Sequence, residues 1–339
     1  MLPTCAEAYF ITKPAQNHKN FIQEGQILNI SKPYTNRKGL GKRILRARQL
    51  YLFLLLPLVY LIIFQYVPMF GLQIAFKEYS ISKGIIGSPW IGFKYFEKFF
   101  KDYNFLRILV NTLRVSLYSL AVSFFIPIVL ALSLNCLRNT KVKKTVQTIT
   151  YIPHFVSTVV LVGMVNQMLN PIIGLYGNAV QAITGVRATD ILGIPAAFPH
   201  LYVWTGIWQN MGWGSIIYMA ALASSDQELH EAAQIDGASR FQRVIHVDIP
   251  TILPTAIIML ILDCGRVMNV GFEKVYLMQN SLNLSYSEVI STYVYKMAFG
   301  GNSNFSYSTA VGMFNSVVNF VLIMSVNQIS KRVSDTSLW

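Results

Sequence analysis

The most prominent pattern along the chain is a series of long apolar stretches separated by polar segments. A helix needs about 20 residues to cross about 30 Å of hydrocarbon. Stretches of that length cover residues 50–70, 115–137, 149–169, 201–223, 251–270 and 309–329. They are continuous rather than alternating apolar with polar, which favours helices over the strands of a membrane barrel. The pattern predicts an all-α integral membrane protein with six transmembrane helices.

The composition supports this prediction. Hydrophobic residues make up 53% of the chain and charged residues 13%, about half the charged share of soluble domains. So few charges do not cover the surface of a water-soluble protein of 339 residues. The cysteines Cys5, Cys136 and Cys264 are far apart, without the spacing of a metal site or a disulfide framework.

The net charge of +13 does not indicate nucleic-acid binding, because the cations gather in the N-terminal segment and between the apolar stretches. Of the 28 Lys and Arg, 17 fall on the side of the six-helix topology that holds both termini and 9 on the other side. Cations are enriched in cytoplasmic loops, so both termini are expected in the cytoplasm.

Three regions follow from the pattern. Residues 1–49 are basic and lack periodicity or a cleavable signal peptide, which predicts a largely disordered cytoplasmic tail. Residues 50–330 form the transmembrane domain, and residues 331–339 a short second tail. Within the domain, residues 90–105 alternate aromatic rings with lysines. This segment is interpreted either as a helix in the headgroup region or as an aromatic anchor for the second span.

The polar segment 224–254, between the fourth and fifth spans, carries the most information. Ser225 and Glu228 predict a capping box that opens a helix over about 227–236. Gly237 permits a turn. Beyond it Phe241, Val244, Ile245 and Val247 follow at helical spacing, and Pro250 is placed to open the next helix. The first helix is acidic and rich in alanine, which favours docking onto a protein over resting on the bilayer.

Part of this segment resembles the EAA loop of binding-protein-dependent ABC importer permeases. The matching residues are Glu231, Ala232, Ala233 and Gly237, followed after nine residues by Val247-Asp248-Ile249-Pro250. The family pattern has Ile and Leu where this chain has Val247 and Ile249. The extension Asp236-Gly237-Ala238 resembles the sugar-importer branch, and residues 151–157, 269–273 and 337–339 resemble an oligosaccharide and polysaccharide subfamily.

The resemblance implies a type I ABC importer permease in a bacterial cell membrane. Glu231, Ala232, Ala233, Asp236, Gly237 and Pro250 would belong to the coupling loop. The expected partners are a second homologous permease, a cytoplasmic ABC ATPase dimer, an extracellular sugar-binding protein or lipoprotein, and membrane lipids. The chain has no GxxxxGK[ST] loop. We therefore expect no enzymatic activity and no cofactor of its own, with ATP bound by the ATPase partner.

Polar residues inside predicted spans are candidates for the substrate pathway. Asp263 and Arg266 are three residues apart, which predicts one helical face shared with Met259 and Val270. The pair either neutralises itself inside the bundle or faces a water-filled pathway, and the two interpretations are compatible.

Asn210 and Trp213 of the fourth span combine an amide with an aromatic face, a pairing that suits sugars. Trp204 and Trp208 are interpreted as interface anchors. His154, beside Pro153, is interpreted as structural.

Two other functional classes fit the sequence less well. An ion-gradient-driven secondary transporter would use Asp263 as its coupling carboxylate, but it leaves segment 224–254 unexplained and predicts an inverted repeat that the sequence does not show. A membrane-embedded enzyme needs a reactive cluster such as HExxH or GxSxG, and the sequence contains neither.

Overall fold

The structure is a computed structural model, and it describes residues 48–301 and 303–333. Within these residues the regular secondary structure is helical, with one isolated bridge between Lys77 and Trp90. The chain divides into two compact units, Met1–Val67 and Pro68–Trp339. The predicted tails lie almost entirely outside the described residues.

The first unit contributes α2 (Arg48–Leu61) and the π-helical turn η1 (Ile62–Tyr66). Their side chains are exposed on every side, although nearly all of them are apolar. A helix that is apolar all round needs lipid or a partner to cover it. Both elements belong to an apolar helical run over Arg48–Phe76 that contains the predicted first span.

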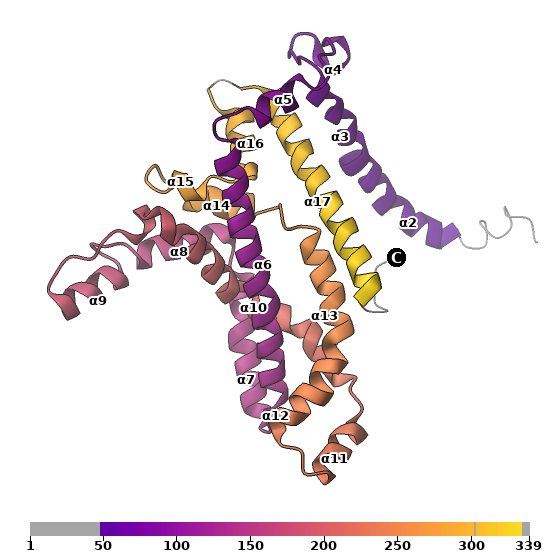
Figure 1. The fold of residues 1–339 in the computed structure, drawn as a ribbon, viewed down its shortest axis with the longest axis vertical. Coiled ribbons are helices and arrows are strands. Elements are labelled where there is room, and N and C mark those ends of the chain that lie inside the picture. The colour runs from indigo at the N-terminus through magenta and orange to yellow at the C-terminus, as the bar shows by residue number, and fades with distance from the viewer. Residues whose placement is uncertain (1–47, 302, 334–339) are drawn as a thin grey trace, which may run out of the picture. The chain divides into compact units, whose positions relative to one another are not determined.

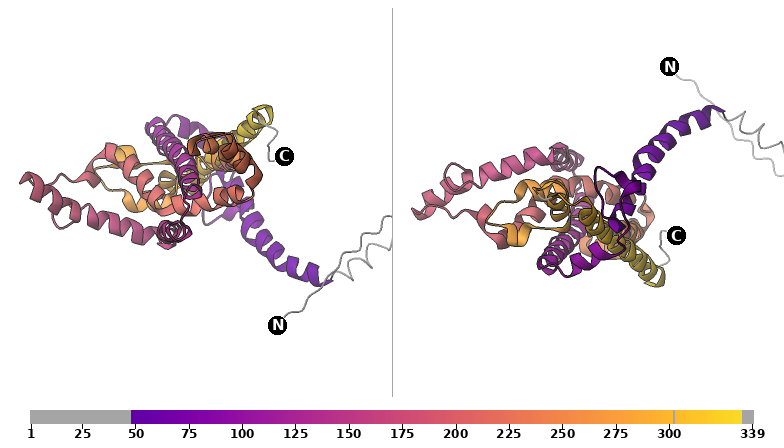
Figure 2. Two further views of the ribbon diagram at one scale, coloured as in Figure 1. Left: turned by 90° about the horizontal axis from the view of Figure 1, so that it is seen from below. Right: turned by 90° about the horizontal axis from the view of Figure 1, so that it is seen from above.

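The second unit is built around the long helix α6, which packs against α10 (Figure 1). The arm formed by α8 and α9 extends to one side of the unit (Figure 2). The helices after α2 and η1 are α3 (Val67–Met69), η2 (Phe70–Phe76), α4 (Gly84–Gly87), α5 (Lys94–Phe100), α6 (Phe105–Asn135), α7 (Thr140–Tyr151), η3 (Ile152–Phe155), α8 (Thr158–Met168), α9 (Leu175–Thr184), η4 (Ile191–Gly193), η5 (Pro195–Ala197), α10 (Phe198–Ala223), α11 (Gln227–Ile235), α12 (Arg240–Arg243), η6 (Val244–Asp248), α13 (Ile249–Cys264), α14 (Phe272–Met278), α15 (Leu284–Ser287), α16 (Ile290–Phe299) and α17 (Phe305–Val333).

Helical structure occupies each of the six predicted spans, which confirms an all-α membrane protein. Among the described residues, four helical runs are long and apolar enough to cross a membrane: Arg48–Phe76, Phe105–Asn135, Arg240–Cys264 and Phe305–Arg332. A bent pair, α7–η3 with α8, is a possible fifth. The 26-residue helix α10 is not among these runs, so the count of six spans stays a prediction.

Two predicted spans differ from a straight helix. The span 149–169 is broken by a bend of 100° between Phe155 and Thr158. At the break, Val156 and Ser157 adopt extended backbone angles and the Ser157 side chain accepts a hydrogen bond from the Val160 amide, so a new helix begins there. The predicted span 251–270 is also wrong at its C-terminal end, because α13 stops earlier, at Cys264, and a turn follows.

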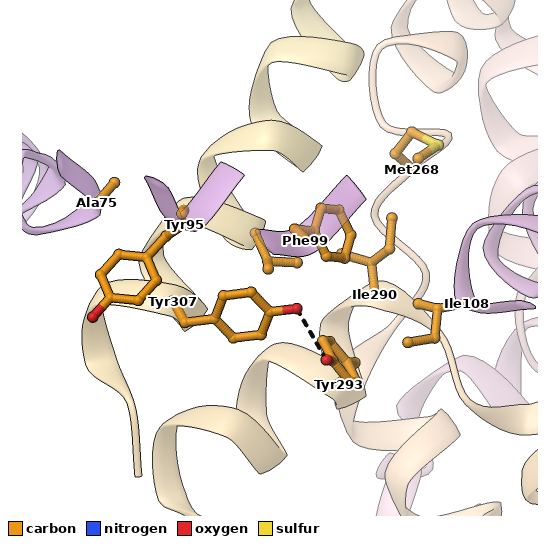
Figure 3. Packing of buried hydrophobic residues seen from close by; sticks show 10 residues of the cluster. Ala75, Tyr95, Phe99, Ile108, Met268, Ile290, Tyr293 and Tyr307 are labelled. Carbon is orange, nitrogen blue, oxygen red and sulfur yellow. Dashed lines mark hydrogen bonds between the residues drawn. The ribbon is translucent and has the colours of Figure 1, made fainter. Parts of the chain in front are cut away.

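Aromatic residues join α5 to α16 and α17. Tyr95 and Phe99 of α5 are buried in a cluster with Tyr293 of α16 and Tyr307 of α17 (Figure 3). Two aromatic rings of segment 90–105 thus pack inside the protein. Neither of the two interpretations of this segment, a headgroup helix or an aromatic anchor, included such a role. The Asp102 carboxylate accepts hydrogen bonds from the hydroxyls of Tyr293 at 2.9 Å and Tyr307 at 3.0 Å.

The surroundings of Asp102 favour its charged form. Partial burial raises the pKa of this carboxyl, but hydrogen bonds from Asn104, Tyr293 and Tyr307 outweigh that effect and hold the pKa below its usual value. A group whose pKa is depressed by folding stabilises the fold above its unfolded pKa, and this contribution is lost as the pH falls through the folded pKa. Asp102 therefore stabilises the packing of α5 on α16 and α17 at neutral pH.

We predict that Asp102→Leu destabilises the protein by about 1–3 kcal/mol, because two tyrosine hydroxyls lose a charged acceptor. For a chain of this size the midpoint of thermal unfolding in detergent should drop by about 2–8 °C. Glu97→Gln is the control, because Glu97 forms an exposed ion pair with Lys101 in the same region and such pairs contribute little. Equal midpoints for both variants would contradict the role of Asp102.

Candidate functional site

Helix α11 begins at Gln227, as predicted, but its N-cap is one residue later than the sequence suggested. The Asp226 side chain accepts a hydrogen bond from the Glu228 amide at 2.9 Å, so Asp226 is the N-cap. The predicted capping box of Ser225 and Glu228 is wrong, and the Ser225 hydroxyl is buried without a hydrogen-bond partner. A carboxylate caps as well as a hydroxyl and adds a favourable charge at the helix N-terminus. A capping box does open α12, between Ser239 and Gln242.

The turn after α11 is as predicted. Gly237 has a φ of +78°, the left-handed conformation that glycine adopts without strain. The Ala238 amide donates to the Ala233 carbonyl at 2.9 Å, and the Gly237 amide donates to the Gln234 carbonyl at 3.1 Å. These are the two bonds of a Schellman motif, which closes the end of a helix.

The segment after the turn differs from the prediction. Helical structure is continuous over Arg240–Cys264 and includes the π-helical turn η6. Pro250 lies in the first turn of α13, but it follows η6 directly instead of starting a separate helix. Proline lacks an amide hydrogen and its ring crowds the carbonyl four residues earlier, and the wider π-helical turn before Pro250 makes room for the ring.

The outer surface of α11 combines apolar and acidic side chains. Leu229 is 56% exposed and Ile235 86% exposed. Glu231, Ala232, Asp236, Gly237 and Pro250 of the predicted coupling loop are also exposed, whereas Ala233 is half-buried. Figure 1 shows α11 at one end of the second unit and α4 and α5 at the other. An exposed apolar face on a short polar helix indicates a surface that another protein covers.

A polar cavity of about 190 Å³ lies among α6, α10 and the end of α13. It contains Asp263 and Arg266, so the structure brings these two predicted residues together. The cavity is also lined by polar residues that the sequence analysis missed, namely Ser116, Ser119, Ser123, Tyr202 and Asn269. The three serines follow one face of α6, and their helical spacing inside an apolar span was the available signal. The Ser116 hydroxyl is buried and has no hydrogen-bond partner.

Asp263 and Arg266 do not share a helical face, contrary to the prediction. Arg266 lies in the turn after α13, as does the segment leading to Val270. The turn is stabilised from α17, where Asn319 accepts a hydrogen bond from the Met268 amide at 3.0 Å. In the described part of the chain no nitrogen–oxygen distance of 4.0 Å or less joins the charged groups of Asp263 and Arg266. Both side chains border the cavity.

Asn210 and Trp213 lie at a different place. The Trp213 ring stacks on His154, with centroids 4.5 Å apart and planes at 5°. The His154 ring nitrogen Nδ1 is 2.9 Å from the Asn210 Oδ1, and the Asn210 amide donates to the Gly206 carbonyl. These contacts tie α10 to the bend between α7 and α8, beside His154. Neither Asn210 nor Trp213 lines the cavity that contains Asp263.

Known proteins resemble this chain in sequence and in structure. Residues 123–335 match the family model described as "Binding-protein-dependent transport system inner membrane component". Protein LplB of Bacillus subtilis is 42% identical over 294 residues, which cover 87% of this chain and 92% of that protein. The polygalacturonan/rhamnogalacturonan transport system permease protein YteP of Bacillus subtilis is 38% identical, with coverage of 89% and 94%.

A solved structure is also similar. A chain of a bacterial ABC transporter involved in the import of the acidic polysaccharide alginate matches with a TM-score of 0.80 and 38% identity. The match covers 87% of this chain and 99% of that chain. The family match, these relatives and the long apolar helical runs describe a multi-pass membrane protein, and the chain belongs to the family of binding-protein-dependent transport system inner membrane components.

Proposed function

We propose that this chain is the permease subunit of an ATP-driven importer of oligosaccharides, in which it forms half of the translocation pathway. The single observation that carries the proposal is the exposed apolar and acidic surface of α11 at one end of the second unit. In the proposed importer, α11 is the coupling helix and sits against a cytoplasmic ATPase subunit. The similarity to LplB, YteP and the alginate importer chain supports this assignment.

The proposed substrate is an oligosaccharide that contains uronic acids. The cavity offers serine hydroxyls and the Asn269 amide for sugar hydroxyl groups, and Arg266 for a carboxylate. A guanidinium group binds a carboxylate through two parallel hydrogen bonds. The names of YteP and of the alginate transporter both refer to polysaccharides rich in acidic sugars, which supports this choice. Asn210 and Trp213 remain predicted pathway residues at a second location.

The remaining parts follow from the same proposal. A second, homologous permease completes the pathway, an ABC ATPase dimer binds ATP, and an extracellular sugar-binding protein delivers the substrate. In this proposal we expect neither an ATPase site nor a cofactor in the chain itself. Both termini are proposed to lie in the cytoplasm of a bacterial cell, with residues 1–49 and 331–339 as tails. A secondary transporter that uses Asp263 would not need the exposed surface of α11.

We predict that Gly237→Leu strongly impairs coupling without preventing membrane insertion. A leucine at a φ of +78° is strained by about 1 kcal/mol, which redirects α11 against its partner. Substrate-stimulated ATP hydrolysis by the reconstituted transporter should fall about tenfold or more. Gly185→Leu is a matched control, because Gly185 has a φ of +69° at the end of α9 and no atom within 4 Å of an added Cβ, as at Gly237. Equal stimulation in both variants would exclude α11 as the coupling helix.

We also predict that Arg266→Gln weakens uptake of acidic substrates selectively. Removing the guanidinium group should raise the KM for a uronate oligosaccharide about 10- to 100-fold, since a lost charged contact costs about 2 kcal/mol or more. Uptake of a neutral oligosaccharide of the same length should change much less. The control is Arg187→Gln, at an exposed arginine that does not line the cavity. An unchanged KM for the uronate substrate would remove Arg266 from the pathway.

A further inference from the structure

A buried carboxylate lies where three helical elements meet. Asp248 is the last residue of η6 and is only 2% exposed. Its Oδ1 atom is 3.3 Å from Nε2 of His230 on α11. The same oxygen accepts a hydrogen bond at 3.1 Å from the side-chain amide of Asn135, the last residue of α6. One carboxylate oxygen therefore contacts α11 and α6 from the start of α13.

These contacts are required by the burial of Asp248. A carboxylate removed from water is costly unless hydrogen bonds and positive charges surround it. Asp248 borders a cavity of about 220 Å³ that is also lined by His230 and by three arginines, Arg138, Arg240 and Arg243. The Asp248 side chain in turn holds the His230 ring and the Asn135 amide in place.

Helix α11 has few other attachments. Among the described side chains, its polar contacts with other elements are His230 with Asp248 and Gln234 with Arg243, the latter at 3.4 Å. Its apolar residues Leu229 and Ile235 point outward, at 56% and 86% exposure. Of these two polar contacts, only the first involves a buried partner, so it is the firmer polar connection between α11 and the rest of the unit.

Two elements connected by Asp248, α6 and α13, line the cavity that contains Asp263. Ser116, Ser119 and Ser123 belong to α6, and Asp263 belongs to α13. At 1.5 Å per residue, the distance along α6 from Asn135 to Ser123 is about 18 Å. The distance along α13 from Asp248 to Asp263 is about 22 Å. Both stretches are helical, each with one internal proline, Pro127 and Pro254, so they can carry a displacement at Asp248 toward the cavity walls.

We propose that the contact of His230, Asp248 and Asn135 is the link that transmits displacement of α11 to α6 and α13, two of the helices that line the cavity. This inference rests on the proposed function. In it, Asp248 and His230 are positioning residues. They touch neither sugar nor nucleotide, and they determine how much sugar is imported for each ATP hydrolysed.

The test uses the complete transporter, reconstituted in proteoliposomes with its ATPase subunits, second permease and binding protein. Sugar uptake and ATP hydrolysis are measured together, so that the ratio is independent of the amount of assembled complex. We expect Asp248→Asn and His230→Phe each to lower the uptake per ATP about fivefold or more. The double variant His230→Asp with Asp248→His reverses the pair and should recover at least about half of the ratio.

His246→Gln is the matched control for His230→Phe. His246 lies in the same helical run as Asp248, is exposed, and contacts the Gln242 carbonyl of its own turn at 2.9 Å. Its uptake per ATP should equal that of the unmodified transporter. If the uptake per ATP of both single variants stays within about twofold of the unmodified value, the proposed link is wrong. This holds even if less complex assembles, because the contact would then support only the structure.

The proposed function fails by a different result. If the unmodified complex does not increase ATP hydrolysis in response to the loaded binding protein, the assignment of the chain as a permease subunit is wrong. If it does, and the variants also couple normally, only the link through Asp248 is wrong.

Discussion

A chain that crosses hydrocarbon must pair every backbone amide and carbonyl group within the protein, because lipid offers no partners. Continuous helices meet this requirement, and α6 and α17 do so over 31 and 29 residues. Each departure from a helix then needs specific side chains. Ser157 caps α8 after the 100° bend. After the end of α13, the Asn319 side chain accepts a hydrogen bond from the Met268 amide. The polar residues inside the membrane domain are in part the consequence of these breaks.

The same breaks create the geometry of the proposed site. Because α13 ends at Cys264, Arg266 and Asn269 leave the helix and border a polar cavity opposite the serines of α6. If the helix had continued to residue 270, Arg266 and Asn269 would be part of α13 and not of the turn that borders the cavity. At the other end of α13, the π-helical turn η6 places Asp248 against His230 and Asn135. Helix α13 thus connects the polar cavity at one end with the surface helix α11 at the other. A transporter in which movement of α11 opens or closes the cavity needs such a connection.

Much of this arrangement follows from the sequence alone. Apolar length predicted helices at every span, and Gly237 predicted the turn after α11, because few other residues adopt a positive φ. The prediction was less accurate where two residues competed for one role. Ser225 and Asp226 are both good N-caps, and the sequence does not tell which one the helix selects.

Contacts between distant segments were the least predictable. The cavity was only partly foreseen, because Asp263 and Arg266 are conspicuous charges whereas serines on an apolar helix are not. The stacking of Trp213 on His154 joins residues from helices far apart in the chain, as does the contact of Asp248 with Asn135. Such pairs depend on how helices pack, and periodicity within one helix carries no information about them.

The central claim is that α11 lies in the cytoplasm against a nucleotide-driven partner. Ile235 is 86% exposed and is suited to a photo-crosslinking side chain that leaves the helix intact. The most direct measurement is crosslinking from this position in native membranes, with and without ATP. The account predicts one major product with an ATPase subunit, whose yield changes when ATP binds. Crosslinks to lipid alone, or labelling of position 235 by an impermeant reagent from outside the cell, would contradict it.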